Sequence, residues 1–112
     1  MANSHDLKTL PIYFDAVLRG DKTFEIRKND RDFQTGDTLV LKEWDPTWTA
    51  PPEPYDYTKP PMVQPAPVMP GRFTGREIMA TASYILHDTW GQFGLERGYV
   101  VIGLTDVSGL LE

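Results

Sequence analysis

The 112-residue chain has no cysteine, which excludes disulfide bridges and zinc sites built on thiolates. Histidines are few, and His5 and His87 lie far apart along the chain, in no spacing typical of metal ligands. Long apolar runs are also absent: none approaches the roughly 20 residues of a membrane span, and the N-terminus lacks the apolar core of a signal peptide. We therefore expect a cytoplasmic protein without a membrane partner, a metal or a cofactor.

The chain also lacks the excess of basic residues typical of non-specific nucleic-acid binders, whose affinity comes from neutralising phosphates. It has 11 Lys and Arg against 16 Asp and Glu, a net charge of −5. The imbalance lies mostly after residue 43, because residues 1–43 carry seven basic and eight acidic residues. A protein that coats RNA or DNA is therefore not expected, but a local basic rim in the first part is compatible with the sequence.

The length predicts one domain, residues 1–112. A helix is expected over about 11–19, because apolar residues recur there at helical spacing, Pro11 suits the first turn and Gly20 suits the position after the last. Alternation and composition predict strands over 5–9, 22–28, 38–44, 76–86 and 99–104, the last of them central and buried. This pattern favours an α+β, mainly β fold: a small β-barrel of about five or six strands with one main helix packed on it.

Residues 45–74 interrupt this pattern, since nine of the ten prolines lie between Pro46 and Pro70. Proline donates no ladder hydrogen bond and favours extended backbone, so we expect a long surface loop inserted between two strands of the domain. The aromatic residues of this loop are Trp48, Tyr55 and Tyr57. Two interpretations stay open: a partly disordered insertion, and a flap whose aromatic side chains cover a ligand site or a partner surface.

The charged segment over residues 20–31 carries the strongest functional signal. Polar and apolar residues alternate in its first half, so Thr23, Glu25 and Arg27 share one face of the expected strand. Phe24 and Ile26 share the other face. We expect the apolar face to anchor the strand, which would give the polar face a fixed direction.

A carboxylate and a guanidinium two residues apart can grip a polar ligand, or only each other. Arg27 offers a planar fork of donors to a phosphate or a base edge. Glu25 can accept a hydrogen bond from an exocyclic amine, or act as a general base where it is partly buried. Lys22 can orient a polar ligand, or act as a nucleophile or base where it is desolvated. The alternative is a set of surface ion pairs worth about 0–1 kcal/mol each, with a turn anchored by Asp30.

The candidate ligand-binding residues are Lys22, Glu25, Arg27, Asp30, Arg31, Trp44 and Tyr84. The two aromatic residues among them offer rings on which a base can stack. For an enzyme, the catalytic candidates are Lys22 and Glu25. His5 is expected at a strand end, and it would join the site if residues 5–9 pair beside residues 22–28.

Two stretches of sequence together resemble a known family. The first runs from His5-x-Leu7-Lys8 through a Gly20-x-Lys22-x-x-Glu25-x-Arg27 core to Glu43-Trp44. The second runs from an expected turn at Phe73-Thr74-Gly75-Arg76 through Tyr84-Ile85-Leu86 to Gly98-Tyr99-Val100-Val101. With this frame the chain, except residues 45–72, resembles the ASCH domain of the PUA-like superfamily. It is most similar to a phage- and bacterium-associated branch of uncharacterised ASCH proteins.

This resemblance implies a small β-barrel with a helix packed on it and a cleft near the helix end and the second strand. Members of the family are thought to bind RNA or modified nucleosides. One ASCH group is similar to amidohydrolases that remove the acetyl group of N4-acetylcytidine, with a lysine, a threonine three residues later and a glutamate elsewhere. Lys22 matches that lysine, whereas Glu25 stands in place of the threonine, and no counterpart of the glutamate is located.

Three functions are therefore compatible with the sequence, and whether the chain is an enzyme stays open. The first is a binding module for RNA, a nucleotide or a nucleoside, for which the acidic chain favours a small ligand or one flipped base over a long duplex. The second is a hydrolase of a modified nucleoside such as N4-acetylcytidine. The third is a protein-interaction module that binds its partner through the proline-rich loop.

Overall fold

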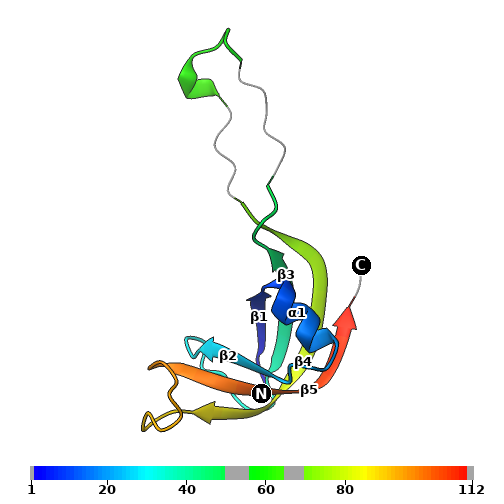
Figure 1. Ribbon diagram of the computed structural model, residues 1–112, viewed down its shortest axis with the longest axis vertical. Coiled ribbons are helices and arrows are strands. Elements are labelled where there is room, and N and C mark those ends of the chain that lie inside the picture. Colours follow the sequence, from blue (N-terminus) through cyan, green and yellow to red (C-terminus); the bar gives the residue numbers. More distant parts are fainter. Residues whose placement is uncertain (1, 50–55, 65–69, 111–112) are drawn as a thin grey trace.

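The computed structural model describes residues 2–49, 56–64 and 70–110. These residues form one curled five-stranded sheet with one main helix beside it (Figure 1). The elements are β1 (Ser4–Thr9), α1 (Pro11–Leu18), β2 (Phe24–Lys28), β3 (Thr38–Asp45), the 3-10 helix η1 (Pro61–Val63), β4 (Arg72–His87) and β5 (Tyr99–Leu110). The predicted mainly β, barrel-like α+β fold with one main helix is confirmed.

The strand order β1-β3-β4-β5-β2 places β1 and β2 at the two edges of the sheet. β1 pairs with β3 in parallel, and the other neighbours pair antiparallel. The long strand β4 shifts register against β5 between Met79 and Thr81 and again between Ala82 and Tyr84. Such bulges bend a strand and increase its twist. The sheet accordingly curls into a half-barrel that brings its two edges toward each other (Figure 1).

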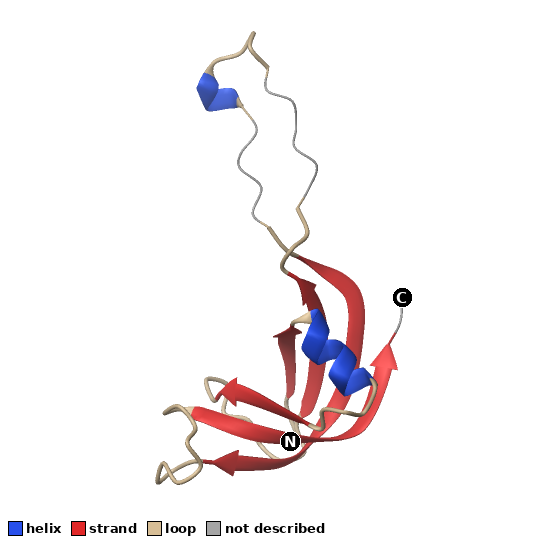
Figure 2. Cartoon of the chain, in the orientation of Figure 1, coloured by secondary structure: helices blue, strands red, loops and turns tan. Residues whose placement is uncertain are grey.

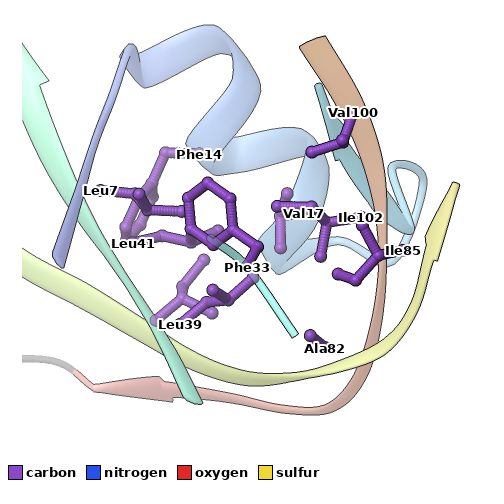
Figure 3. Close-up of a cluster of buried hydrophobic side chains, with 11 residues drawn as sticks. Leu7, Phe14, Val17, Phe33, Leu39, Leu41, Ala82, Ile85, Val100 and Ile102 are labelled. Carbon is purple, nitrogen blue, oxygen red and sulfur yellow. The ribbon is translucent and has the colours of Figure 1, made fainter. Parts of the chain in front are cut away.

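The core fills the inside of this curl. α1 contributes Phe14 and Val17, and the loop after β2 contributes Phe33. Figure 3 shows these side chains packed against inward-facing residues of the strands. Those strand residues are Leu7, Leu39, Leu41, Ile78, Ala82, Ile85, Val100 and Ile102. The helix predicted over about 11–19 is confirmed, with Pro11 at its start and a positive φ of 84° at Gly20 after its end.

Two strands are several residues longer than predicted, whereas β2 begins two residues later than predicted. β5 continues to Leu110, and β4 begins at Arg72, so the turn expected over residues 73–76 is wrong. Gly75 has a φ of 95°, a backbone conformation that glycine often adopts in turns. Pairing with β3, in which Phe73 lies opposite Trp44, keeps this stretch in the sheet despite the glycine. The strand expected over 99–104 to be central and buried does lie inside the sheet, between β4 and β2, but of these residues only Val100 and Ile102 are buried.

The prediction that the apolar face of β2 is the buried one is wrong. Glu25 is only 3% exposed, whereas Phe24 is 41% and Ile26 49% exposed. The strand lies at the sheet edge, where its inner face meets polar groups of β1 and of the turn after α1, and its outer face is open. Alternation therefore identified the two faces of the strand but not which of them points inward.

The proline-rich segment lies between β3 and β4, as predicted, and its described residues 56–64 lie away from the sheet (Figure 2). Residues 49–70 are called the arm below. At its base Gly71 donates its N–H to the carbonyl of Trp48 at 2.6 Å. At its far end, residues 56–64 are held together by Gln64, whose amide accepts from Asp56 N at 3.0 Å and donates to Asp56 O at 2.7 Å. Tyr55 lies outside the described residues. Among those that are described, no helix has the length and apolar character needed to cross a membrane.

Candidate functional site

The two edges of the half-barrel leave a seam between β1 and β2, and a cavity lies along it. This cavity has a volume of about 500 Å³. It is lined by Lys8, Thr9, Leu10, Tyr13, Lys22, Phe24, Glu25, Ile26 and Arg27. The lining thus combines a sheet edge from each side with the start of α1 and the turn that follows α1.

The buried Glu25 carboxylate is at the centre of the polar lining. Its Oε1 accepts from Lys22 Nζ at 2.6 Å, and its Oε2 accepts from Arg27 Nε at 3.0 Å. The Glu25 side chain is 4% exposed, against 18% for Lys22 and 25% for Arg27. A carboxylate this deeply buried is stable as an ion only when charged partners surround it, and these two provide that compensation.

Arg27 spans the seam. Besides its bond to Glu25, its Nη2 donates to Lys8 O at 2.9 Å and to Thr9 Oγ1 at 3.2 Å, both on β1. A second arginine, Arg31, donates from Nη1 to Asp6 O on the same strand. Along a strand, the backbone groups of every second residue point to the same side. The carbonyls of Asp6 and Lys8 therefore lie on the same edge of β1, the edge that does not pair with β3. Guanidinium groups thus connect two edges that no backbone ladder joins.

Lys22 is placed by the end of α1. The N–H groups of Asp21 and Lys22 both donate to Ala16 O, at 2.9 and 3.0 Å, which turns the chain sharply from the helix into β2. The Lys22 ammonium lies 5.4 Å from the ring centroid of Tyr13 and 5.4 Å from that of Phe24. Two half-exposed rings therefore flank the charged pair at the cavity wall, and each can favour a cation or stack against a planar group.

The structure brings three of the predicted site residues together: Lys22, Glu25 and Arg27 line one cavity. The other four do not line it. Asp30 is an exposed partner of Arg31 at 4.0 Å, and Arg31 itself reaches β1 beyond the cavity. Trp44 contacts the lining residue Lys8, whose ammonium lies 4.1 Å from the centroid of the Trp44 ring. Tyr84 is 65% exposed on β4, on the far side of β5 from β2.

Sequence reasoning missed the aromatic wall made by Tyr13 and Phe24, and it missed Thr9. Tyr13 falls at helical apolar spacing and so indicates a core residue, but it is 50% exposed. Thr9 enters the site only because the sheet curls until β1 faces β2. Its position on β1 gives no local signal for that.

His5 does not join the site, because β1 pairs with β3 and not with β2. Its Nε2 lies 2.8 Å from Asp37 Oδ2 in a buried pair. Burial raises the pKa of Asp37, but hydrogen bonds from the backbone N–H groups of Asn3 and Gln34, together with His5, outweigh it and hold that pKa below its usual value. Among the residues the structure describes, no group of three or more His, Asp or Glu side chains is placed to hold a metal ion.

Comparison with known proteins places the chain within a family. Residues 4–104 match the family described as "Domain of unknown function (DUF3850)". A similar protein is the "Uncharacterized 12.9 kDa protein in GpA 3'region" of Escherichia phage P2, which is 52% identical over 44 residues. That alignment spans 39% of this chain and 40% of the phage protein, so it covers less than half of either. Because the family match extends over most of its length, the chain belongs to the DUF3850 family.

Proposed function

We propose that the cavity at the seam binds a base or a modified nucleoside, either as a small ligand or as one unstacked residue of an RNA. The observation that carries this proposal is the convergence of Lys22, Glu25 and Arg27 with the rings of Tyr13 and Phe24 on one cavity. Its volume of about 500 Å³ lies within the range of small-molecule sites. The resemblance to ASCH domains points to the same class of ligand.

Different residues would make different contacts with such a ligand. Half-exposed aromatic rings offer stacking surfaces, which every base can use. Arg27 and Lys22 supply hydrogen-bond donors, and Glu25 keeps both in place. Thr23 O accepts from Leu104 N, so alternation along β2 points the backbone groups of Phe24 and Ile26 away from β5, toward the seam. A base edge in the cavity would meet both a backbone donor and a backbone acceptor there.

Titration of the protein with the four ribonucleosides, followed by amide chemical shifts, tests this proposal. Removal of the ring in Tyr13→Ala or Phe24→Ala should weaken binding about tenfold, the effect expected for one stacked base. Tyr84→Ala is the matched control, because it removes an exposed aromatic ring outside the cavity lining and should leave binding unchanged. Equal losses in all three variants, or shifts away from the seam, would refute a base site here.

A second candidate function is hydrolysis of an acylated base such as N4-acetylcytidine. The observation that favours it is the presence of Lys22, Glu25 and the Thr9 hydroxyl in one cavity. Water would add to the acetyl carbon, the C–N bond would break, and acetate and cytidine would leave, with the Lys22–Glu25 pair transferring the protons. Turnover of N4-acetylcytidine that is the same in wild type and Lys22→Ala would end this idea.

A third candidate is capture of a protein through the arm. Residues 56–64 form a tip ordered by Gln64, and on it Met62 is 89% and Val63 56% exposed. Two neighbouring apolar side chains exposed in this way offer a protein partner an apolar contact. If this candidate is right, Met62→Ser with Val63→Ser should abolish capture of the partner and leave the affinity for nucleosides unchanged.

A further inference from the structure

The rim of the cavity carries a cation, Lys8, that lies beside an aromatic ring. The exposed Lys8 lines the cavity, and its ammonium lies 4.1 Å from the centroid of the Trp44 ring. The adjacent carboxylate of Asp6 pairs instead with Lys42 at 3.4 Å. Within the described part of the chain, Lys8 makes no ion pair. Contact with the indole restricts this long side chain, so binding an anion would cost it less conformational entropy.

The net charge of the cavity lining also favours an anionic ligand. Lys8, Lys22 and Arg27 contribute three positive charges against the single negative charge of Glu25, in a protein whose net charge is −5. Both oxygens of Glu25 already accept hydrogen bonds, from Lys22 and from Arg27. About half of the acceptor sites of the carboxylate are therefore already used, which leaves fewer for an exocyclic amine. The side chains of the cavity offer a ligand mostly donors and positive charge.

We propose that the ligand is a nucleotide and that its phosphate binds Lys8 at the rim while its base lies in the cavity. This inference rests on the proposed function, since it assumes that a base occupies the seam. The phosphate can belong to a free nucleotide or to the backbone of a strand. In both cases the ammonium of Lys8, supported by Trp44, supplies a charge-assisted hydrogen bond to a phosphate oxygen.

The test measures the contribution of the phosphate directly. Wild-type protein is titrated in low salt with the four ribonucleosides, their 5′-monophosphates and the four matching dinucleoside monophosphates. We expect the best monophosphate to bind about tenfold more tightly than its nucleoside, the effect of one charge-assisted hydrogen bond. In Lys8→Gln this advantage, measured against the nucleoside affinity of the same variant, should fall to less than about threefold. Lys28→Gln, which removes an exposed lysine outside the cavity lining, should keep the full advantage.

The dinucleoside monophosphates identify the source of the phosphate. If they share the advantage of the monophosphates and lose it in Lys8→Gln, the site accepts a backbone phosphate. If they bind only as well as nucleosides, the site requires a terminal phosphate. Nucleosides that bind as tightly as their monophosphates, or an advantage that survives Lys8→Gln, would overturn the phosphate site but leave the base site standing. No binding by any nucleoside or nucleotide would refute the proposed function, and this inference with it.

Discussion

Arg27 on one edge strand donates from Nη2 to the carbonyl of Lys8 on the other edge strand, at 2.9 Å. The two strands are the ends of the sheet order and share no backbone ladder. The same guanidinium holds Glu25 at 3.0 Å through Nε, so one side chain both closes the seam and fixes the polar lining of the cavity. The same residue therefore contributes both to closing the half-barrel and to forming the site.

Arg27→Lys should open the seam. A lysine keeps the charge but cannot place donors at once on Glu25, Lys8 O and Thr9 Oγ1. We expect the free energy of unfolding to fall by about 1–3 kcal/mol, measured by urea denaturation, and the β2 amides to exchange faster with solvent. Arg19→Lys, in an exposed pair with Asp21, is the control and should change stability by less than about 0.5 kcal/mol. Unchanged exchange in Arg27→Lys would show that the seam does not need the guanidinium.

Glu25→Gln should be more costly. The substitution preserves the shape of the side chain but leaves two largely buried cations, Lys22 and Arg27, without their counter-charge. Removing one partner of a buried ion pair typically costs about 3–5 kcal/mol, and we expect a loss of about 3 kcal/mol because both cations keep some contact with water. Chemical denaturation at pH 7 measures it. Asp21→Asn removes an exposed, paired carboxylate next to the same turn and should cost no more than about 1 kcal/mol, and a comparable loss in both variants would contradict the central role of Glu25.

The origin of the site explains which parts of it were predictable. Lys22, Glu25 and Arg27 come from one short motif, so their spacing alone brings them together once the turn after α1 is made. Thr9 and Tyr13 reach the same cavity from other elements, and only the curl of the sheet decides that. Local spacing carries no information about which two strands become the edges of the sheet.

Local sequence also does not determine which face of β2 points inward. A strand that alternates polar and apolar residues is compatible with either face inward, and burial of apolar area favours Phe24 and Ile26. The edge position reverses this, because Glu25 pairs with Lys22 and Arg27 on the inner side.

Trp44 and Tyr84 were attractive candidates as aromatic residues. Both lie on other strands, outside the cavity lining, and the wall is built by rings closer to the motif.

The buried pair of His5 and Asp37 should give stability an acid dependence. The pKa of Asp37 is lowered in the folded state, since hydrogen bonds to its ionised form outweigh the effect of burial. A depressed pKa contributes stability that is present above the unfolded pKa, near 4, and is lost as pH falls through the folded value. We expect the free energy of unfolding to decrease more steeply below about pH 4 in wild type than in Asp37→Asn. Asp30→Asn, which changes a carboxylate that is 62% exposed, should keep the wild-type slope.

The arm should be dispensable for the fold and for the seam. Trp48 O and Gly71 N are joined by a 2.6 Å hydrogen bond, so the two ends of the arm already stand at the separation of a tight turn. Replacing residues 49–70 by Asn-Gly would connect them with a sequence that favours a two-residue hairpin loop. Next to this hydrogen bond, Asp45 of β3 pairs with Arg72 of β4, and the rest of the two strands would stay paired.

We expect this shortened protein to unfold in one cooperative transition, with a free energy of unfolding equal to that of wild type or up to about 2 kcal/mol higher, because a shorter loop loses less entropy when it closes. Its affinity for nucleosides should also be unchanged, since none of the described residues of the arm lines the cavity. Urea denaturation and the nucleoside titration measure the two quantities. Loss of nucleoside binding with stability retained would instead assign the arm to the ligand site, as a flap over the seam. Loss of cooperative unfolding would show that the arm supports the β3–β4 pair.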